Sequence, residues 1–178
     1  MAMEGLGQSS EEKVSDMMQF IGDFMSDSVK DRSSAEHAFN LVKQNCHEDL
    51  ASNLCLFQES PKEKKRAMAA VLLRKLLTGN FLQQLSPNLK SNVTTKLLLR
   101  LNEEEQKDIR MKLCLVVFAV ASVYLPEWPE FWPFFCRSSD STENRHLESA
   151  LLILVKLSPE TMMLNMQCIQ LLFSNSLC

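Results

Sequence analysis

The chain of 178 residues is long enough to bury a hydrophobic core as one or two ordinary domains, and 46% of it is apolar against 23% charged. Its formal net charge of −3 gives no general attraction to nucleic acid or anionic membranes and slightly favours basic partners. Glycine occurs only 4 times and methionine 10 times, so the composition favours helix over strand.

The cysteines and the first residues of the chain indicate the cellular compartment of the protein. The cysteines are not closely paired, which is typical of reduced thiols in a cytoplasmic or nuclear protein. They are Cys46, Cys55, Cys114, Cys136, Cys168 and Cys178. The first residues lack a basic region followed by an apolar core, so we expect no secretory signal. The apolar stretch 113–125 is shorter than a membrane span, so we expect a buried helix there and no membrane span.

Helix-start signals divide the chain clearly. Ser28 with Asp31 approximates a capping box, in which a side chain accepts an unpaired N–H of the first helical turn, and four similar pairs occur. Those pairs are Ser9 with Glu12, Ser60 with Glu63, Asn102 with Glu105, and Asp140 with Glu143. Pro87 follows a serine, the favoured first-turn position for proline. The expected helices are 9–25, 29–44, 47–58, 61–78, 87–101, 103–125, 128–137, 141–157 and 160–173, with a short helical turn at 80–85.

Four arginines each open an apolar helical run. They are Arg32, Arg66, Arg110 and Arg145, at intervals of 34, 44 and 35 residues, with another helix between successive copies. Such intervals predict an all-α fold, a HEAT or armadillo type superhelix built as a solenoid of antiparallel helix pairs. Repeat arrays present long surfaces to other macromolecules, so we look for function on a surface.

The second helix of the second pair separates into two faces. Ala69, Leu72, Leu73 and Leu76 follow the spacing of one buried face. The opposite stripe carries Lys64, Ala67, Met68, Val71, Arg74, Lys75 and Thr78. Lys112 occupies a similar stripe position on the corresponding helix of the third pair. This stripe could be a solvated surface or a contact surface.

Several segments in order resemble a known family. AAVLLRKLL (69–77), RMKLCLVVFAVAS (110–122) and WPEFWPFF (128–135) resemble the N-terminal HEAT repeats of the karyopherin-β, or importin-β, nuclear transport receptors. The similarity spans residues 9–160, and the most similar subgroup by eye contains importins four and five, which carry histones and ribosomal proteins. Asn80-Phe81 departs from the family, which often has tryptophan there.

The resemblance implies a function. In that family the N-terminal repeats bind the GTP form of the GTPase Ran, mainly through the second (B) helices on the concave surface. The family's basic residue late in the second B helix corresponds to Lys75, with Arg74 beside it. We therefore take Arg74, Lys75 and Lys112 as candidate Ran-binding residues. A transport receptor is expected in cytoplasm and nucleus, with basic cargo such as histones or ribosomal proteins.

The family pattern also predicts how the chain is divided. Residues 1–8 are expected to form a disordered tail and 9–160 the repeat domain. Residues 161–178 are expected to be the orphan apolar helix of an incomplete repeat. Family members have many more repeats, so the chain resembles a truncated or alternatively ended receptor.

Other residues could form a binding surface or a metal site, but a structural role explains them more simply. Trp128, Phe131, Trp132, Phe134 and Phe135 could form a binding surface; the prolines among them and the lack of interleaved basic residues favour a packed seam between repeats. The three histidines are isolated and no zinc-ligand spacing occurs, so we expect no metal and no cofactor.

Residues 103–105 are three glutamates that we expect at a helix N-terminus, where the helix dipole explains them. No phosphate loop, nucleophile elbow or dinucleotide fingerprint is present, so we expect neither an enzyme nor a direct nucleic-acid binder. The alternative to a transport receptor is a HEAT-type protein–protein scaffold unrelated to transport.

Overall fold

The structure is a computed structural model that describes residues 19–78 and 81–157. Within these residues every regular element is helical, which confirms the predicted all-α class. Residues 19–24 are helical, and the further elements are α2 (Val29–Asn45), α3 (His47–Phe57), α4 (Glu63–Leu77), α5 (Phe81–Gln84), α6 (Pro87–Glu103), α7 (Lys107–Tyr124), the 3-10 helix η1 (Leu125–Glu127), α8 (Phe131–Ser139) and α9 (Asn144–Lys156). The predicted tail, the capping pair of Ser9 and Glu12, and the predicted helix 160–173 lie outside the described residues.

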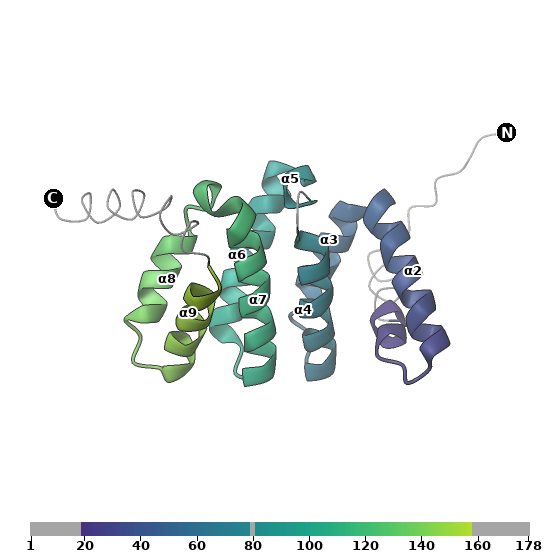
Figure 1. The fold of residues 1–178 in the computed structure, drawn as a ribbon, viewed down its shortest axis with the longest axis horizontal. Coiled ribbons are helices and arrows are strands. Elements are labelled where there is room, and N and C mark those ends of the chain that lie inside the picture. The colour runs from purple at the N-terminus through teal and green to yellow at the C-terminus, as the bar shows by residue number, and fades with distance from the viewer. Residues whose placement is uncertain (1–18, 79–80, 158–178) are drawn as a thin grey trace.

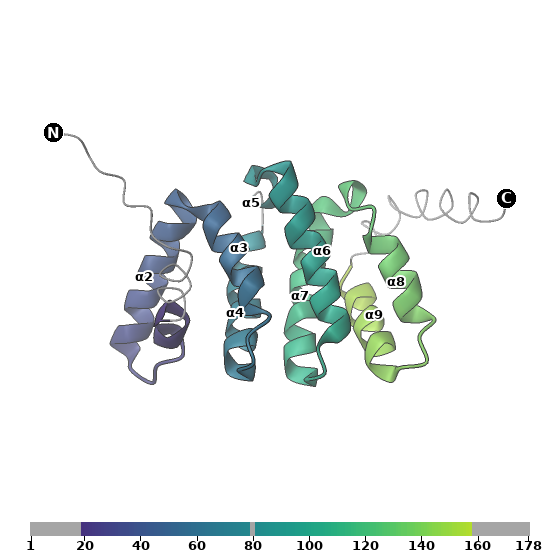
Figure 2. The same cartoon turned by 180° about the vertical axis from the view of Figure 1, so that it is seen from behind.

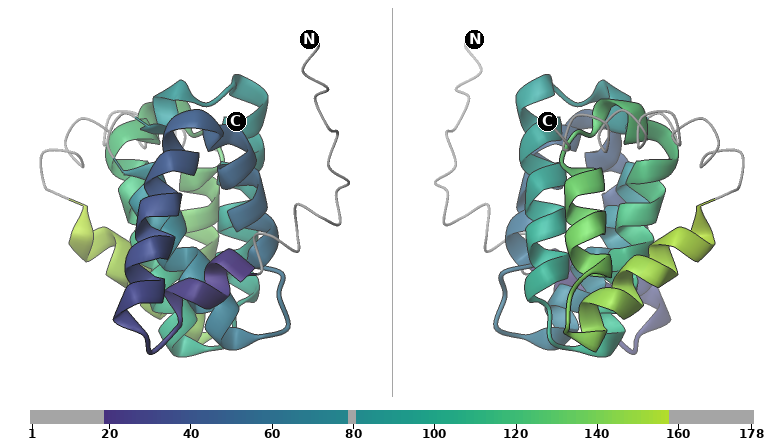
Figure 3. Two further views of the ribbon diagram at one scale, coloured as in Figure 1. Left: turned by 90° about the vertical axis from the view of Figure 1, so that its right-hand side faces the viewer. Right: turned by 90° about the vertical axis from the view of Figure 1, so that its left-hand side faces the viewer.

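The helices form two layers (Figures 1 and 2). One layer contains α2, α4, α7 and α9, and the other contains α3, α6 and α8; the end-on views of Figure 3 show them side by side. Each pair packs on itself and on its neighbour, most extensively between α4 and α7. This is the predicted solenoid of antiparallel helix pairs. We call α2, α4, α7 and α9 the B layer.

The buried face predicted for α4 is the one observed, although Ala67 and Met68 of the predicted opposite stripe are partly buried against the core. Ala69, Leu72, Leu73 and Leu76 are buried, while Arg74 and Lys75 are exposed. The apolar stretch of α7 is buried in the same way, with Leu113, Val116, Val117 and Val120 in the core. By length and composition alone, 107–127 could cross a membrane, with a mean hydropathy of 1.7. Because half of it is buried against other helices, it reads as the central helix of the array.

The aromatic cluster belongs to the core, as its prolines indicated. Trp128, Phe131, Trp132 and Phe134 are buried and Phe135 is half-buried. The rings of Trp128 and Phe131 have centroids 5.3 Å apart, and those of Phe131 and Trp132 lie 5.2 Å apart. The cluster therefore joins α8 to the rest of the core.

Three of the four repeated arginines share a structural role. Arg32, Arg66 and Arg110 each donate a hydrogen bond to the backbone carbonyl six residues earlier, at 2.7, 2.9 and 3.3 Å respectively. Each thereby holds the loop that precedes its own helix. The first two sequence intervals thus mark one repeating contact, whereas Arg145 pairs with Glu143 at 2.6 Å instead.

Two of these arginines also reach the next repeat. Arg66 binds both carboxylate oxygens of Glu104, at 2.8 and 3.0 Å, and these hydrogen bonds raise the pKa of Arg66. Arg110 reaches Glu148 at 3.3 Å. The same interval of 38 residues separates both pairs: Arg66 joins α4 to the loop before α7, and Arg110 joins α7 to α9.

Some predicted helix starts are wrong. Ser28 caps α2 by accepting the Asp31 N–H at 3.3 Å, as predicted. Asn102 instead lies inside α6, and α7 begins only at Lys107, because the Glu104 side chain turns toward Arg66 and accepts the Gln106 N–H at 3.0 Å. Glu103 is accordingly the last residue of α6, so the three glutamates do not open a helix.

Three other starts lie later than predicted. α9 begins at Asn144, because the Ser141 hydroxyl accepts the N–H of Glu143 and holds a turn after Asp140. α4 begins at Glu63, so Ser60 is not its cap. α8 begins at Phe131, after the 3-10 turn.

The cysteines are expected to differ in reactivity. Cys46 is exposed, whereas burial raises the pKa of the Cys55 thiol to about 12 and that of Cys114 to about 11. A higher pKa leaves less of the reactive thiolate at pH 8. Alkylation of the native protein followed by mass spectrometry should label Cys46 before Cys55 and Cys114, which should stay protected until denaturant is added. Labelling of Cys55 at the rate of Cys46 would show that α3 is not packed as described.

Candidate protein-binding surface

Arg74 and Lys75 project from the last turn of α4, in the B layer. The Lys75 ammonium pairs with the carboxylate of Glu36 on α2 at 2.9 Å, and the two side chains are 47% and 59% exposed. Ion pairs this exposed contribute little to stability, so a partner can displace this one at small cost. Arg74 is exposed and makes no hydrogen bond or ion pair with any residue that the structure describes. Both cations are therefore available to a ligand.

A third cation, which the sequence analysis did not select, lies beside them. Lys43 of α2 donates a hydrogen bond to the Lys75 carbonyl at 3.2 Å, and its ammonium lies 5.0 Å from the centre of the Phe81 ring. The interval of 34 residues between Arg32 and Arg66 places Lys43 level with Leu77, so the sequence did contain the signal. We call Lys43, Arg74 and Lys75 the basic patch.

Lys112 does not join the basic patch. It lies in the second turn of α7, is half-buried, and donates to the carbonyl of Asp108 at 3.3 Å. Arg66 and Arg110 make equivalent loop contacts, so Arg74 is level with Phe118 of α7, six residues beyond Lys112. At a rise of 1.5 Å per residue, Lys112 is offset by roughly 9 Å along the helix axis. It can act only as a separate, secondary contact.

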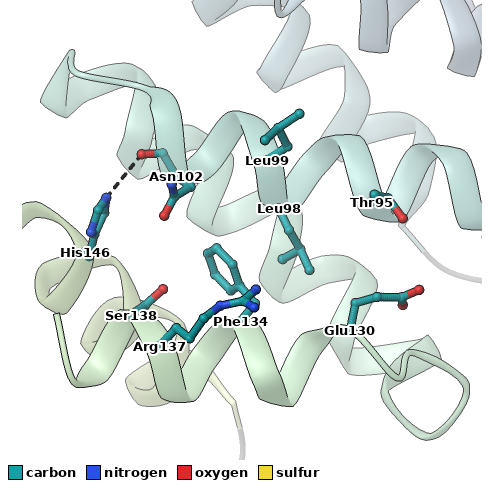
Figure 4. A pocket seen from close by; sticks show the side chains of 9 residues that line it. All are labelled: Thr95, Leu98, Leu99, Asn102, Glu130, Phe134, Arg137, Ser138 and His146. Atoms are coloured by element: carbon teal, nitrogen blue, oxygen red, sulfur yellow. Dashed lines mark hydrogen bonds between the residues drawn. The ribbon is translucent and has the colours of Figure 1, made fainter.

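The opposite layer has a hollow between α6 and α8, with a volume of about 480 Å³ (Figure 4). Leu98, Leu99 and Phe134 supply apolar lining, and Glu130 and Arg137 supply opposite charges. His146 also lines it, but its Nδ1 lies 2.9 Å from the Ser141 hydroxyl and its Nε2 lies 3.2 Å from the Asn102 carbonyl oxygen. Because both ring nitrogens are engaged, His146 connects two repeats and is not placed for acid–base chemistry or metal binding.

Nothing in the described residues resembles a metal centre: no group of three or more His, Cys, Asp or Glu side chains there could hold an ion.

The two-layered array with an exposed B layer is a karyopherin-like helical solenoid. A search of solved structures finds Kap121p, a karyopherin-β protein, in its complex with RanGTP at a TM-score of 0.75 and 26% identity, covering 86% of this chain. It also finds Kap121p alone at 0.74 and 28% identity over 83% of this chain, and Kap121p bound to Pho4p at 0.74 and 26% over 85%. This chain spans only 14% to 15% of the length of those chains.

Comparisons of the sequence alone add nothing further. No protein-family model matches the chain, and no curated protein matches it. The similarity to the karyopherin-β proteins is thus carried by the fold together with about one identical residue in four.

Proposed function

We propose that this chain is the N-terminal portion of a karyopherin-β nuclear import receptor and that its B layer binds the GTP form of Ran. The observation that best supports this proposal is the basic patch. In it, Arg74 is unpaired among the described residues and Lys75 is only weakly paired, and both lie on an exposed helix face. The fold similarity to Kap121p, whose structure is known bound to RanGTP, supports the same proposal.

The remaining parts of the proposal follow from the same resemblance. We assign residues 9–160 to the N-terminal repeats and place the protein in cytoplasm and nucleus. Cargo would be basic proteins such as histones or ribosomal proteins, as in the subgroup of importins four and five. The structures of Kap121p bound to Pho4p and to Nup53p support the proposal that the partners of this chain are proteins.

The test is a pull-down of the purified chain with Ran loaded with GTP or with GDP. A transport receptor should retain Ran-GTP and release Ran-GDP, because the family distinguishes the two nucleotide states. A scaffold unrelated to transport should retain neither. Equal retention of both forms would contradict the proposal as well.

Charge reversal of the basic patch should weaken that binding. Replacing Arg74 and Lys75 together by glutamate removes two interfacial cations and introduces two like-sign repulsions with acidic partner groups. The expected loss is about 2 kcal/mol or more, roughly thirtyfold in Kd. Calorimetric titration with Ran-GTP measures it, and circular dichroism checks that helix content is unchanged, since neither side chain is in the core.

The matched control makes the same charge change on the same helix. Lys62→Glu with Lys64→Glu alters two exposed lysines at the opposite end of α4. These changes should leave Kd within about threefold, and Lys112→Glu should have an intermediate effect. If the Arg74 and Lys75 variant binds as tightly as the unchanged protein, this contact site is wrong.

A further inference from the structure

A second polar concavity lies at the edge of the array where the loops of the second and third helix pairs meet. The α3–α4 loop (58–62) and the α6–α7 loop (104–106) follow one another along this edge (Figures 1 and 2). The concavity between them has a volume of about 460 Å³, within the range of ligand sites. We call it the acidic notch; the residues that matter are Gln58, Glu59, Glu63, Arg100, Glu103 and Glu105.

The charge balance of the acidic notch is strongly negative. Five glutamates line it against two arginines, and both arginines are engaged within the chain. Arg66 is held by Glu104, and Arg100 bridges Glu59 at 3.2 Å and Glu103 at 2.9 Å.

Two glutamates of the acidic notch are paired with neither arginine. Glu63 and Glu105 are exposed, and their carboxylates form no hydrogen bond or ion pair with the part of the chain that the structure describes. The notch therefore has acceptors that no internal cation uses.

A buried polar side chain also lines the notch without a partner. Gln58 is only 4% exposed, yet neither its amide nitrogen nor its amide oxygen has a hydrogen-bond partner among the described residues. Leaving a buried polar group unpaired costs about 1–3 kcal/mol. An apolar side chain would avoid this cost, so the amide is a polar group that a ligand entering the notch would satisfy. A side-chain amide offers one acceptor and two donors, which suits a group with several N–H donors beside a carbonyl.

These features select the kind of ligand. A metal ion does not fit, because no group of three acidic, histidine or cysteine side chains in the described residues could hold one. A guanidinium group does fit, because it presents five donors in a plane and binds carboxylates through paired hydrogen bonds. Lys62 and Lys64 flank Glu63 at the start of α4 but do not line the notch, so they leave its acceptors open.

We propose that the acidic notch binds an arginine side chain from an extended segment of a partner protein. Its guanidinium donates to the carboxylates of Glu63 and Glu105 and to the Gln58 amide oxygen, and the adjacent peptide carbonyl accepts from the Gln58 amide nitrogen. The site lies at the end of α4 opposite to Arg74 and Lys75 and does not rest on Ran binding.

The test uses the full chain and a fluorescently labelled peptide of alternating glycine and arginine. The comparison peptide carries citrulline, which has the shape of arginine without its charge. Fluorescence anisotropy at low ionic strength should show that the arginine peptide binds at least about tenfold more tightly than the citrulline peptide. Equal affinity for the two peptides, or no binding of either, overturns the proposal.

Variants then locate the site. Glu63→Gln with Glu105→Gln should weaken binding of the arginine peptide about tenfold, whereas Glu127→Gln with Glu130→Gln, which remove the same charge from two other exposed positions, should change it less than twofold. Equal losses in both double variants mean diffuse charge attraction and overturn the proposal.

Gln58→Leu provides a separate readout of the buried amide. It should weaken peptide binding several-fold while circular dichroism shows unchanged helix content, because an apolar side chain of similar size removes the unpaired amide without leaving a cavity. Unchanged peptide affinity in a folded Gln58→Leu protein would overturn the role of the amide. If this variant fails to fold, the two glutamate double variants decide the proposal alone.

Discussion

Replacing Phe131 by alanine is expected to destabilise the C-terminal part of the array by about 3–5 kcal/mol. The Phe131 side chain is fully buried, and its ring packs against Trp128, Trp132 and Phe135 with centroid distances of 5.3, 5.2 and 6.2 Å. Truncation would remove these contacts and leave a cavity between large rigid rings, which cannot collapse to fill it. The packing of α8 on its neighbours depends on this cluster.

The loss of stability caused by Phe131→Ala should be local, because each repeat of such an array is stabilised chiefly by its nearest neighbours. Hydrogen exchange should show α8 and α9 losing protection while α3 and α4 keep theirs. Thermal unfolding should begin earlier, by roughly 2–4 °C for each kcal/mol lost.

Phe135→Ala is the matched control for Phe131→Ala, since its ring belongs to the same cluster but is only half-buried. It should cost less than about half as much. Equal effects of the two variants would show that the cluster is not the packed seam described above.

Local periodicity was sufficient to predict the helices and their buried faces. The spacing of Ala69, Leu72, Leu73 and Leu76 identifies the core side of α4, and the same argument leaves Arg74 on the surface. The physical reason is that the apolar stripe of an amphipathic helix is the side that packs against the core, so the spacing of apolar residues shows which side is buried. The recurrence of arginine likewise predicted the helices of the B layer, because each of the four arginines lies near the start of α2, α4, α7 or α9.

Contacts between repeats were not predictable in this way. A capping box was expected at Asn102 and Glu105, but Arg66, 38 residues earlier, recruits Glu104 and delays the start of α7. No local sequence pattern indicates that Glu104 pairs with a residue so far away in the sequence. The unpaired amide of Gln58 gave no signal either, since a glutamine near a loop is expected to face solvent. Both features of the loop edge therefore appear only once the repeats are stacked.

The ion pair between Arg66 and Glu104 is the second contact with a large expected effect. Glu104→Ala should destabilise the array by about 3 kcal/mol, because it leaves a mostly buried guanidinium without its carboxylate. The two side chains are 17% and 8% exposed, so little water can replace the lost partner. Arg66→Met should cost more than Glu104→Ala, because it also removes the hydrogen bond to the Ser60 carbonyl at 2.9 Å.

A double-mutant cycle isolates the ion pair from these other effects. The protein with Arg66→Met and Glu104→Ala together should be more stable than the sum of the two single losses predicts, since the double variant leaves no uncompensated charge. Chemical unfolding measured by circular dichroism supplies the four free energies.

Glu36→Ala serves as the comparison for an exposed ion pair, that of Glu36 with Lys75, and should cost no more than about 1 kcal/mol. Salt should weaken that exposed pair and leave the Arg66–Glu104 coupling nearly unchanged, because mobile ions screen exposed charges far more than buried ones. If the Arg66–Glu104 coupling instead falls with salt as steeply as that of the exposed pair, the ion pair itself is open to solvent. The stacking of the second and third repeats would then rest on the packing of α4 with α7 and of α3 with α6.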